Sequence, residues 1–367
     1  MTSAKTPAIK TDTPDAEARQ AHLHEQTEGN SAGDPSNKSV PGRRRLSPLE
    51  SYNIQVLKGV AISFVVFAHN VPPGLPKVFL RPLFNFPVGL FLFLTGFLST
   101  PQKWNLKKRL IRVLIPYAIW TAAYTAYGHL SVPLTIPKLF ITRFVLGDSA
   151  AIMYYVFVYC ELVFLIPVID RIAKSRLKYP AFSISFISII VFHLFPIVFG
   201  FEYNNVFSRI IYLSCLDWFI FFYFGYLLGN QLFELRISTK SILICLLIFA
   251  GLQMLESYWY YKLGIESYAT NRKLTAMLTT FMYCSMGYRF MQENRNDHSF
   301  DFIKLLGDYS FGIFFSHLFI MNLLARIPHY SQIAIFPLNA IIALALSTLF
   351  VFSARKILGK YSMYLGC

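Results

Sequence analysis

Beyond residue 48 the chain alternates between long apolar stretches and short polar or basic breaks. About ten of these stretches approach the roughly 20 residues that an α-helix needs to cross a bilayer. They run approximately over residues 52–70, 83–100, 111–130, 150–169, 180–199, 208–229, 240–260, 273–291, 305–325 and 333–354. The pattern predicts an all-α fold, a polytopic integral membrane bundle of about 10 transmembrane helices in contact with the lipid bilayer.

The first 48 residues have a different composition. They are rich in Thr, Ser, Asp, Glu, Gly and Pro and contain almost no large apolar side chain, which is typical of a disordered tail. No apolar core followed by a small-residue cleavage site is present, so we expect no signal peptide. Three consecutive arginines at 43–45 predict that the tail stays in the cytoplasm. We therefore expect a disordered cytoplasmic tail over 1–48, a transmembrane domain over 49–356 and a short cytoplasmic C-terminal tail over 357–367.

Composition supports a membrane protein. The chain is 55% hydrophobic and 14% charged, with a mean hydropathy of +0.46, whereas soluble domains carry about 25% charged residues. The net charge of +15 is therefore read as the excess of cytoplasmic Lys and Arg, and no nucleic-acid partner is expected. The five cysteines are scattered without metal-ligand spacing, which predicts neither a disulfide framework nor a metal site.

The distribution of basic residues predicts an orientation. An even number of spans returns the C-terminus to the starting side. Placing the tail and the even-numbered loops in the cytoplasm gives those loops about 17 of the 34 Lys and Arg residues, against about 9 for the opposite loops. The bias favours an N-in, C-in topology. Three basic residues do not fit this topology, because it places them outside: Lys262, Arg272 and Lys273.

The first predicted span carries a lysine and a histidine at its two ends. Lys58 and His69 are eleven residues apart, which on a helix is only about 20° more than three turns and roughly 16 Å along the axis. Two such side chains on one face of a membrane helix are costly, which favours a functional role. His69 is suited to act as a general base near neutral pH. The alternative is a histidine at the helix end that water satisfies.

Arg109 and Arg112 begin the third predicted span. Their i, i+3 spacing places both guanidinium groups on one side of the helix, where they could clamp a polyphosphate. The alternative is a basic anchor on the cytoplasmic side, without a ligand.

Further polar side chains lie within the predicted spans. His317 either faces a central cavity or forms an interhelical hydrogen bond, for example through Ser316. Glu161 and Asp217 are intramembrane carboxylates that could orient a histidine or bind sugar hydroxyls. Either could instead pair with an arginine, such as Arg209, which we place two turns before Asp217 on the same helix.

Two further sets of residues are interpreted as structural. His193 stands alone in its predicted span, and we expect no special role for it. Gly96, Gly225 and Gly229 lie in apolar runs, where they favour close helix approach.

Together these residues resemble the membrane-bound acyltransferase 3 family, which includes bacterial O-antigen and exopolysaccharide O-acetyltransferases. Four motifs match in order over residues 53–352. The first is Lys58 with His69, and the second is Thr95-Gly96-Phe97. The third is Arg109 and Arg112 followed by Ile115-Pro116-Tyr117, and the fourth runs from Gly307 to His317. Most members are expected to carry arginine at the position of Lys58, and lysine keeps the charge without the bidentate fork. No hydrolase-like domain follows the last predicted span, so the domain over 49–356 resembles a stand-alone transmembrane acyltransferase domain.

The resemblance implies a reaction and its location. It implies an O-acetyltransferase of the bacterial inner membrane that takes acetyl-CoA from the cytoplasm, with Arg109 and Arg112 near the CoA phosphates. The acetyl group would pass to a hydroxyl of a cell-surface or lipid-linked glycan. His69 would act as the base or carry the acyl group transiently, and Lys58 would position the donor. His317, Glu161 and Asp217 would then be substrate-binding candidates.

Other functions fit the same pattern. A membrane transporter or flippase for a glycan or a small solute would also need polar groups within spans, although no internal repeat is visible. A succinyltransferase and a non-catalytic membrane partner are further alternatives. Nothing in the sequence specifies the acceptor sugar or the oligomeric state.

Overall fold

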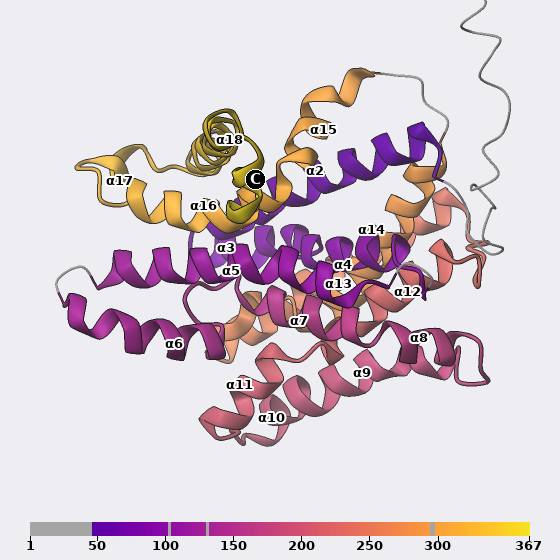
Figure 1. Ribbon diagram of the computed structural model, residues 1–367. Coiled ribbons are helices and arrows are strands. Elements are labelled where there is room, and N and C mark those ends of the chain that lie inside the picture. Colours follow the sequence, from indigo (N-terminus) through magenta and orange to yellow (C-terminus); the bar gives the residue numbers. More distant parts are fainter. Residues whose placement is uncertain (1–45, 102–103, 130–131, 294–297) are drawn as a thin grey trace, which may run out of the picture. The chain divides into compact units, whose positions relative to one another are not determined.

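The computed structural model describes residues 46–101, 104–129, 132–293 and 298–367, so the predicted tail lies almost entirely outside the described residues. Within those ranges every regular element is helical (Figure 1). The all-α prediction is confirmed for this part of the chain.

Helix α2 (Pro48–Asn70) is the first long helix. Ser47 and Glu50 form a capping box at its start, in which each side chain accepts a hydrogen bond from the other residue's backbone N–H. Helix α2 packs closely against α15 (Asp301–Asp308) and also contacts α4 (Pro87–Phe97), as Figure 1 shows for α2 and α15. Because α2 carries both Lys58 and His69, its neighbours form much of the candidate site.

Helix α4 packs very closely against α12 (Phe219–Gly229). A methyl group added to Gly96 would lie 2.0 Å from the carbonyl oxygen of Phe222, and one added to Gly225 would lie 2.0 Å from that of Phe93. The predicted role of these glycines in close helix approach is confirmed, because a side chain on either would separate the two backbones.

A second group of helices packs together with α2 around a shared hydrophobic core. It comprises α5 (Leu106–Gly128), α7 (Tyr154–Phe164), α16 (Ser310–Leu324) and α18 (Leu338–Leu358). The 3₁₀ helix η9 (Gly359–Leu365) follows α18 and packs against α5, where Trp120 donates a hydrogen bond of 3.0 Å to the carbonyl of Leu365. The C-terminal residues predicted as a tail are therefore part of the packed bundle.

The remaining helices complete the described structure. They are α3 (Leu75–Leu80), η1 (Arg81–Phe84), η3 (Pro133–Thr135), α6 (Ile136–Leu146), α8 (Ile166–Ala173), η4 (Pro180–Phe182), α9 (Ser183–Ile189), the π-helix η5 (Ile190–Leu194), α10 (Phe195–Phe199), α11 (Asn205–Leu213), η6 (Leu216–Trp218), α13 (Thr239–Lys262), η7 (Glu266–Ala269), α14 (Leu274–Gln292), η8 (His298–Phe300) and α17 (Tyr330–Ile333).

Six helical segments among the described residues are long and apolar enough to cross a membrane. The pair α15 and α16 would add a seventh, although the two helices meet at a bend of 77°. Each of the ten predicted stretches contains helix, but several are broken into shorter pieces. The prediction of about ten spans and the N-in, C-in topology are therefore not confirmed.

Helix α13 shows how the bundle meets its surroundings. Its exposed side chains are largely apolar and include Leu243, Ile244, Leu247, Ile248, Leu252 and Leu255. A contiguous apolar surface of this kind is unfavourable in water and suited to lipid. This exposure agrees with a multi-pass membrane protein.

Candidate active site

Two cavities lie next to each other within the helical bundle. The first, of about 490 Å³, is called the histidine cavity here because His69 and His193 line it together with Arg81, Asn85 and Arg272. The second, of about 390 Å³, is called the cationic cavity because Lys58, Arg109 and Arg112 line it. Both have the size of small-molecule sites in proteins.

Three aromatic side chains line both cavities and form the wall between them. This aromatic partition consists of Phe91 from α4, Tyr155 from α7 and Phe314 from α16. The rings of Tyr155 and Phe314 are in contact, with their centroids 5.3 Å apart. Since the three residues belong to three different helices, a shift of one helix would be enough to open a passage between the cavities.

The cationic cavity brings together the three basic residues that the sequence singled out. Lys58 comes from the middle of α2, and Arg109 and Arg112 come from the first two turns of α5. Arg109 donates a hydrogen bond of 2.8 Å to the hydroxyl of Ser99, whereas Lys58 has no hydrogen-bond partner among the described residues.

The first turn of α5 contains basic residues and no acidic one. The N-terminus of a helix already carries partial positive charge, so these basic side chains do not stabilise α5. Several cations that line one cavity are, however, favourable for binding phosphate. The cationic cavity therefore has the chemistry of a polyphosphate site.

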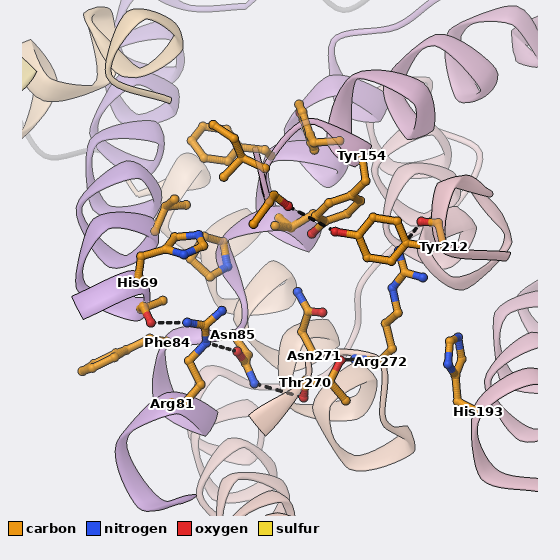
Figure 2. Close-up of a pocket in the computed structure, with 18 of the residues that line it drawn as sticks. His69, Arg81, Phe84, Asn85, Tyr154, His193, Tyr212, Thr270, Asn271 and Arg272 are labelled. Atoms are coloured by element: carbon orange, nitrogen blue, oxygen red, sulfur yellow. Dashed lines mark hydrogen bonds between the residues drawn. The ribbon is translucent and has the colours of Figure 1, made fainter. Parts of the chain in front are cut away.

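His69 lies near the end of α2 and faces the histidine cavity (Figure 2). Its ring contacts the ring of His317, with centroids 5.4 Å apart. His317 is fully buried, and its Nδ1 lies 3.0 Å from the carbonyl oxygen of Ile313 on the same helix. Its Nε2 is buried without a hydrogen-bond partner in the described structure. The two histidines therefore form a pair in which the buried ring of His317 packs against the ring of His69.

Ser316 does not provide the interhelical hydrogen bond considered from the sequence. Its hydroxyl donates to the carbonyl of Gly312, one turn earlier on α16, at 2.9 Å. This bond lies within one helix, so the contact between α2 and α16 at this point is made by the two imidazole rings.

A polar network forms the wall of the histidine cavity below His69 in Figure 2. Arg81 donates through Nε to the side-chain oxygen of Asn85 at 3.1 Å and through a terminal nitrogen to the carbonyl of Ala68. Asn85 in turn donates to the carbonyl of Thr270 at 3.3 Å. Arg81 and Asn85 were not among the predicted site residues, although they are the polar residues that interrupt the apolar run before α4.

Asp217 anchors a second network beside the cavity. It accepts hydrogen bonds from Ser188 at 2.6 Å and lies 2.8 Å from Nε2 of His193 and 3.6 Å from Arg272. The carboxylate is only 4% exposed, so these partners compensate its charge inside the bundle. The expectation that His193 stands alone is wrong, because His193 contacts Asp217 and lines the histidine cavity.

The alternative that a carboxylate pairs with an arginine is confirmed for Asp217, but the partner is Arg272 and not Arg209. Arg209 lies on α11, which ends at Leu213, so Arg209 and Asp217 are not on one helix. Its side chain donates to the carbonyl of Leu146 at 2.7 Å.

The two carboxylates named as substrate-binding candidates lie outside the linings of both cavities. Glu161 is exposed and accepts a hydrogen bond of 2.7 Å from the backbone N–H of Cys215, which stabilises the break between α11 and α12. Asp217 reaches the histidine cavity only through His193 and Arg272. Of the substrate-binding candidates, His317 lies closest to His69.

Comparison with known proteins identifies a family. The family model described as the acyltransferase domain of the acyltransferase 3 family matches residues 51–355. No curated protein and no solved structure matches the chain. The matched region includes every residue that lines the two cavities.

Proposed function

Because the chain belongs to the acyltransferase 3 family, we propose that this multi-pass membrane protein is an O-acetyltransferase. It would transfer an acetyl group from cytoplasmic acetyl-CoA to a hydroxyl of a cell-surface or lipid-linked glycan. The observation that carries the proposal is the pair of adjoining cavities, with three cations in one and His69 in the other.

The cationic cavity would hold the donor. Acetyl-CoA carries a diphosphate and a further phosphate, which are matched by Lys58, Arg109 and Arg112. The arrangement would place this cavity toward the cytoplasm, where CoA is confined, in a bacterial inner membrane. The N-in, C-in topology with about ten spans remains part of this proposal.

The histidine cavity would hold the acceptor. His69 would take the proton from the acceptor hydroxyl as its oxygen attacks the thioester carbonyl carbon. The tetrahedral intermediate would then collapse with cleavage of the carbon–sulfur bond, and the imidazolium would return its proton to the leaving CoA sulfur. His317 would act as a positioning residue for His69. The aromatic partition would have to open for the thioester to reach the hydroxyl.

The first prediction tests His69 in cells. Surface glycans are compared by mass spectrometry in the wild type, in a gene deletion and in the deletion complemented with His69→Ala. We expect an acetyl ester increment that disappears in the deletion and is not restored by the variant, because the variant lacks the base. Membrane insertion of His69→Ala is checked by immunoblotting of the membrane fraction.

Two results would contradict the proposal. If His69→Ala restores the ester, His69 is not the base. If the glycan keeps its modification but reaches the surface in smaller amounts without the protein, a transporter or flippase is favoured instead. A succinyl ester in place of the acetyl ester would retain the mechanism and change the donor.

A further inference from the structure

The charged side chains that line the histidine cavity are all basic. They are Arg81 and Arg272, accompanied by the imidazoles of His69 and His193, and no Asp or Glu lines this cavity among the described residues (Figure 2). A cavity of this kind has a positive potential that favours an anionic ligand. The two arginines differ, however, in how their charges are compensated.

The charge of Arg272 is already compensated. Arg272 lies 3.6 Å from Asp217, donates to the carbonyl of Tyr212 at 2.5 Å and stacks on the ring of Tyr212 at 4.6 Å. It is 7% exposed, so the guanidinium is held rigidly in the cavity wall. These contacts with Asp217 and Tyr212 indicate that Arg272 stabilises the cavity wall.

The charge of Arg81 has no acidic partner among the described residues. Its two hydrogen bonds go to neutral groups, the amide oxygen of Asn85 and the carbonyl of Ala68. Its remaining terminal nitrogen has no hydrogen bond to a described residue, while the side chain lines the cavity. A guanidinium within a membrane protein is unfavourable without a counter-charge, so a bound anion would complete this site.

The position of Arg81 relative to the partition indicates which substrate supplies the anion. Along α4, Pro87 and Val88 line the histidine cavity, Phe91 lines both cavities, and Leu94 and Thr95 line the cationic cavity. Arg81 precedes α4 and therefore lies beyond its histidine-cavity end. Helix α2 shows the same order. Arg81 donates a hydrogen bond to the carbonyl of Ala68, which adjoins His69, and His69 lies eleven residues after Lys58. Arg81 thus lies beside His69, at the end of α2 away from Lys58.

We propose that Arg81 binds an anionic group, a carboxylate or a phosphate, on the acceptor. The inference rests on the proposed function for the identity of the acceptor as a glycan. Asn85 orients the guanidinium by accepting from Nε, and its link to Thr270 fixes η1 to the segment before α14. The acceptor is therefore an acidic sugar or a sugar phosphate, held so that a hydroxyl reaches His69.

The test is a binding measurement on the full-length protein in lipid nanodiscs. Three probes are titrated by isothermal calorimetry: methyl β-glucuronide, glucose 6-phosphate and the neutral methyl β-glucoside. We expect at least one anionic probe to bind roughly tenfold more tightly than the glucoside, as one charge-assisted contact would give. The tighter of the two anionic probes identifies the anion. Equal binding of all three probes, or no binding of either anion, would overturn the inference.

Variants then assign the anion to Arg81. Arg81→Gln should remove the preference for the anion, and Arg81→Lys should keep part of it, because lysine retains the charge without the fork. The matched control is Lys77→Gln, since Lys77 lies near Arg81 in sequence but does not line the cavity. A preference that survives in Arg81→Gln, or that Lys77→Gln removes equally, would overturn the assignment.

Acetyl-CoA binding to the same preparations separates this inference from the proposed function. If acetyl-CoA binds and the anionic sugars do not, the inference on Arg81 fails and the acyltransferase proposal stands. If the anionic sugars bind and acetyl-CoA does not, the anion site at Arg81 stands and the acyltransferase proposal fails.

Discussion

Asp217 is the residue on which the buried charges beside the histidine cavity depend. Its carboxylate accepts from Ser188, contacts His193 and balances Arg272. Removing one partner of a buried charge network leaves the other charges without compensation inside the bundle. Asp217 therefore stabilises the wall of the cavity and does not itself line the cavity.

We predict that Asp217→Ala destabilises the protein by about 3–5 kcal/mol, because Arg272 is left buried and unpaired. Thermal unfolding in detergent, followed by tryptophan fluorescence, measures the loss. The matched control is Glu234→Ala, which removes the carboxylate of the exposed ion pair with Arg236 and should change little. Equal effects of the two substitutions would contradict the role of Asp217.

Arg109 permits a kinetic prediction. Because its guanidinium lines the cationic cavity, Arg109→Ala should raise KM for acetyl-CoA roughly tenfold and lower kcat much less. Acetyl transfer at varied acetyl-CoA concentration measures both constants. Lys107→Ala is the control, because Lys107 begins the same helix but does not line the cavity. A fall in kcat with unchanged KM would exclude Arg109 as a donor-binding residue.

The residues of the site differ in how far the sequence predicts them. Lys58 and His69 belong to one helix, so their spacing alone places them on one face. Arg81 and Arg272 line one cavity through tertiary contacts such as the hydrogen bond from Asn85 to the segment before α14. Such a tertiary contact leaves no periodic pattern in the sequence. Arg272 gave a different signal, since it disagreed with the charge bias of the loops and proves to be buried.

At the scale of elements, pairs of glycines bring helices into backbone contact. On α2 and α15, a methyl group on Gly59 would lie 1.8 Å from the carbonyl oxygen of Ile303, and one on Gly307 equally close to that of Gln55. On α4 and α12, Gly96 and Gly225 play the same part. Both contacts involve a helix that lines the cavities, so they fix the positions of Lys58, His69 and Phe91.

We predict that Gly225→Ala destabilises the protein by about 1–3 kcal/mol or more, because the added methyl group overpacks the contact with α4. Gly251→Ala on α13 is the control, since a methyl group there has no neighbour within 4 Å. Alanine also favours helix over glycine, so the control should be unchanged or more stable. Thermal unfolding of the two variants provides the comparison, and a stable Gly225→Ala variant would contradict close packing.

The breaks within helices could not be predicted from the apolar pattern. Apart from Ser214 and Asp217, residues 210–228 are apolar, yet α11 ends at Leu213 and α12 begins at Phe219. The break is stabilised by Glu161 of another helix, which accepts the hydrogen bond of Cys215 N–H. The sequence predicted where helices occur, and long-range hydrogen bonds decide where they end.

The whole molecule is predicted to place its cationic cavity toward the cytoplasm. Leu134 follows α5 and is 94% exposed, whereas Lys174 follows α8 and its side chain is 55% exposed. In a variant without native cysteines, an impermeant maleimide should label Leu134→Cys on intact cells. Lys174→Cys should react only after permeabilisation, because the N-in, C-in topology places it inside. The opposite labelling pattern would invert the topology and exclude cytoplasmic acetyl-CoA as the donor.

The aromatic partition has a consequence for the cell's energy supply. The two cavities adjoin each other, and among the described residues only Phe91, Tyr155 and Phe314 line both. Moving one proton across a membrane potential of 100 mV releases about 2.3 kcal/mol. A water-filled passage between the cavities would therefore let protons leak across the membrane. Under the proposed function, the three rings that would admit an acetyl group would also insulate the membrane, which favours large side chains at these positions over smaller ones that would speed transfer.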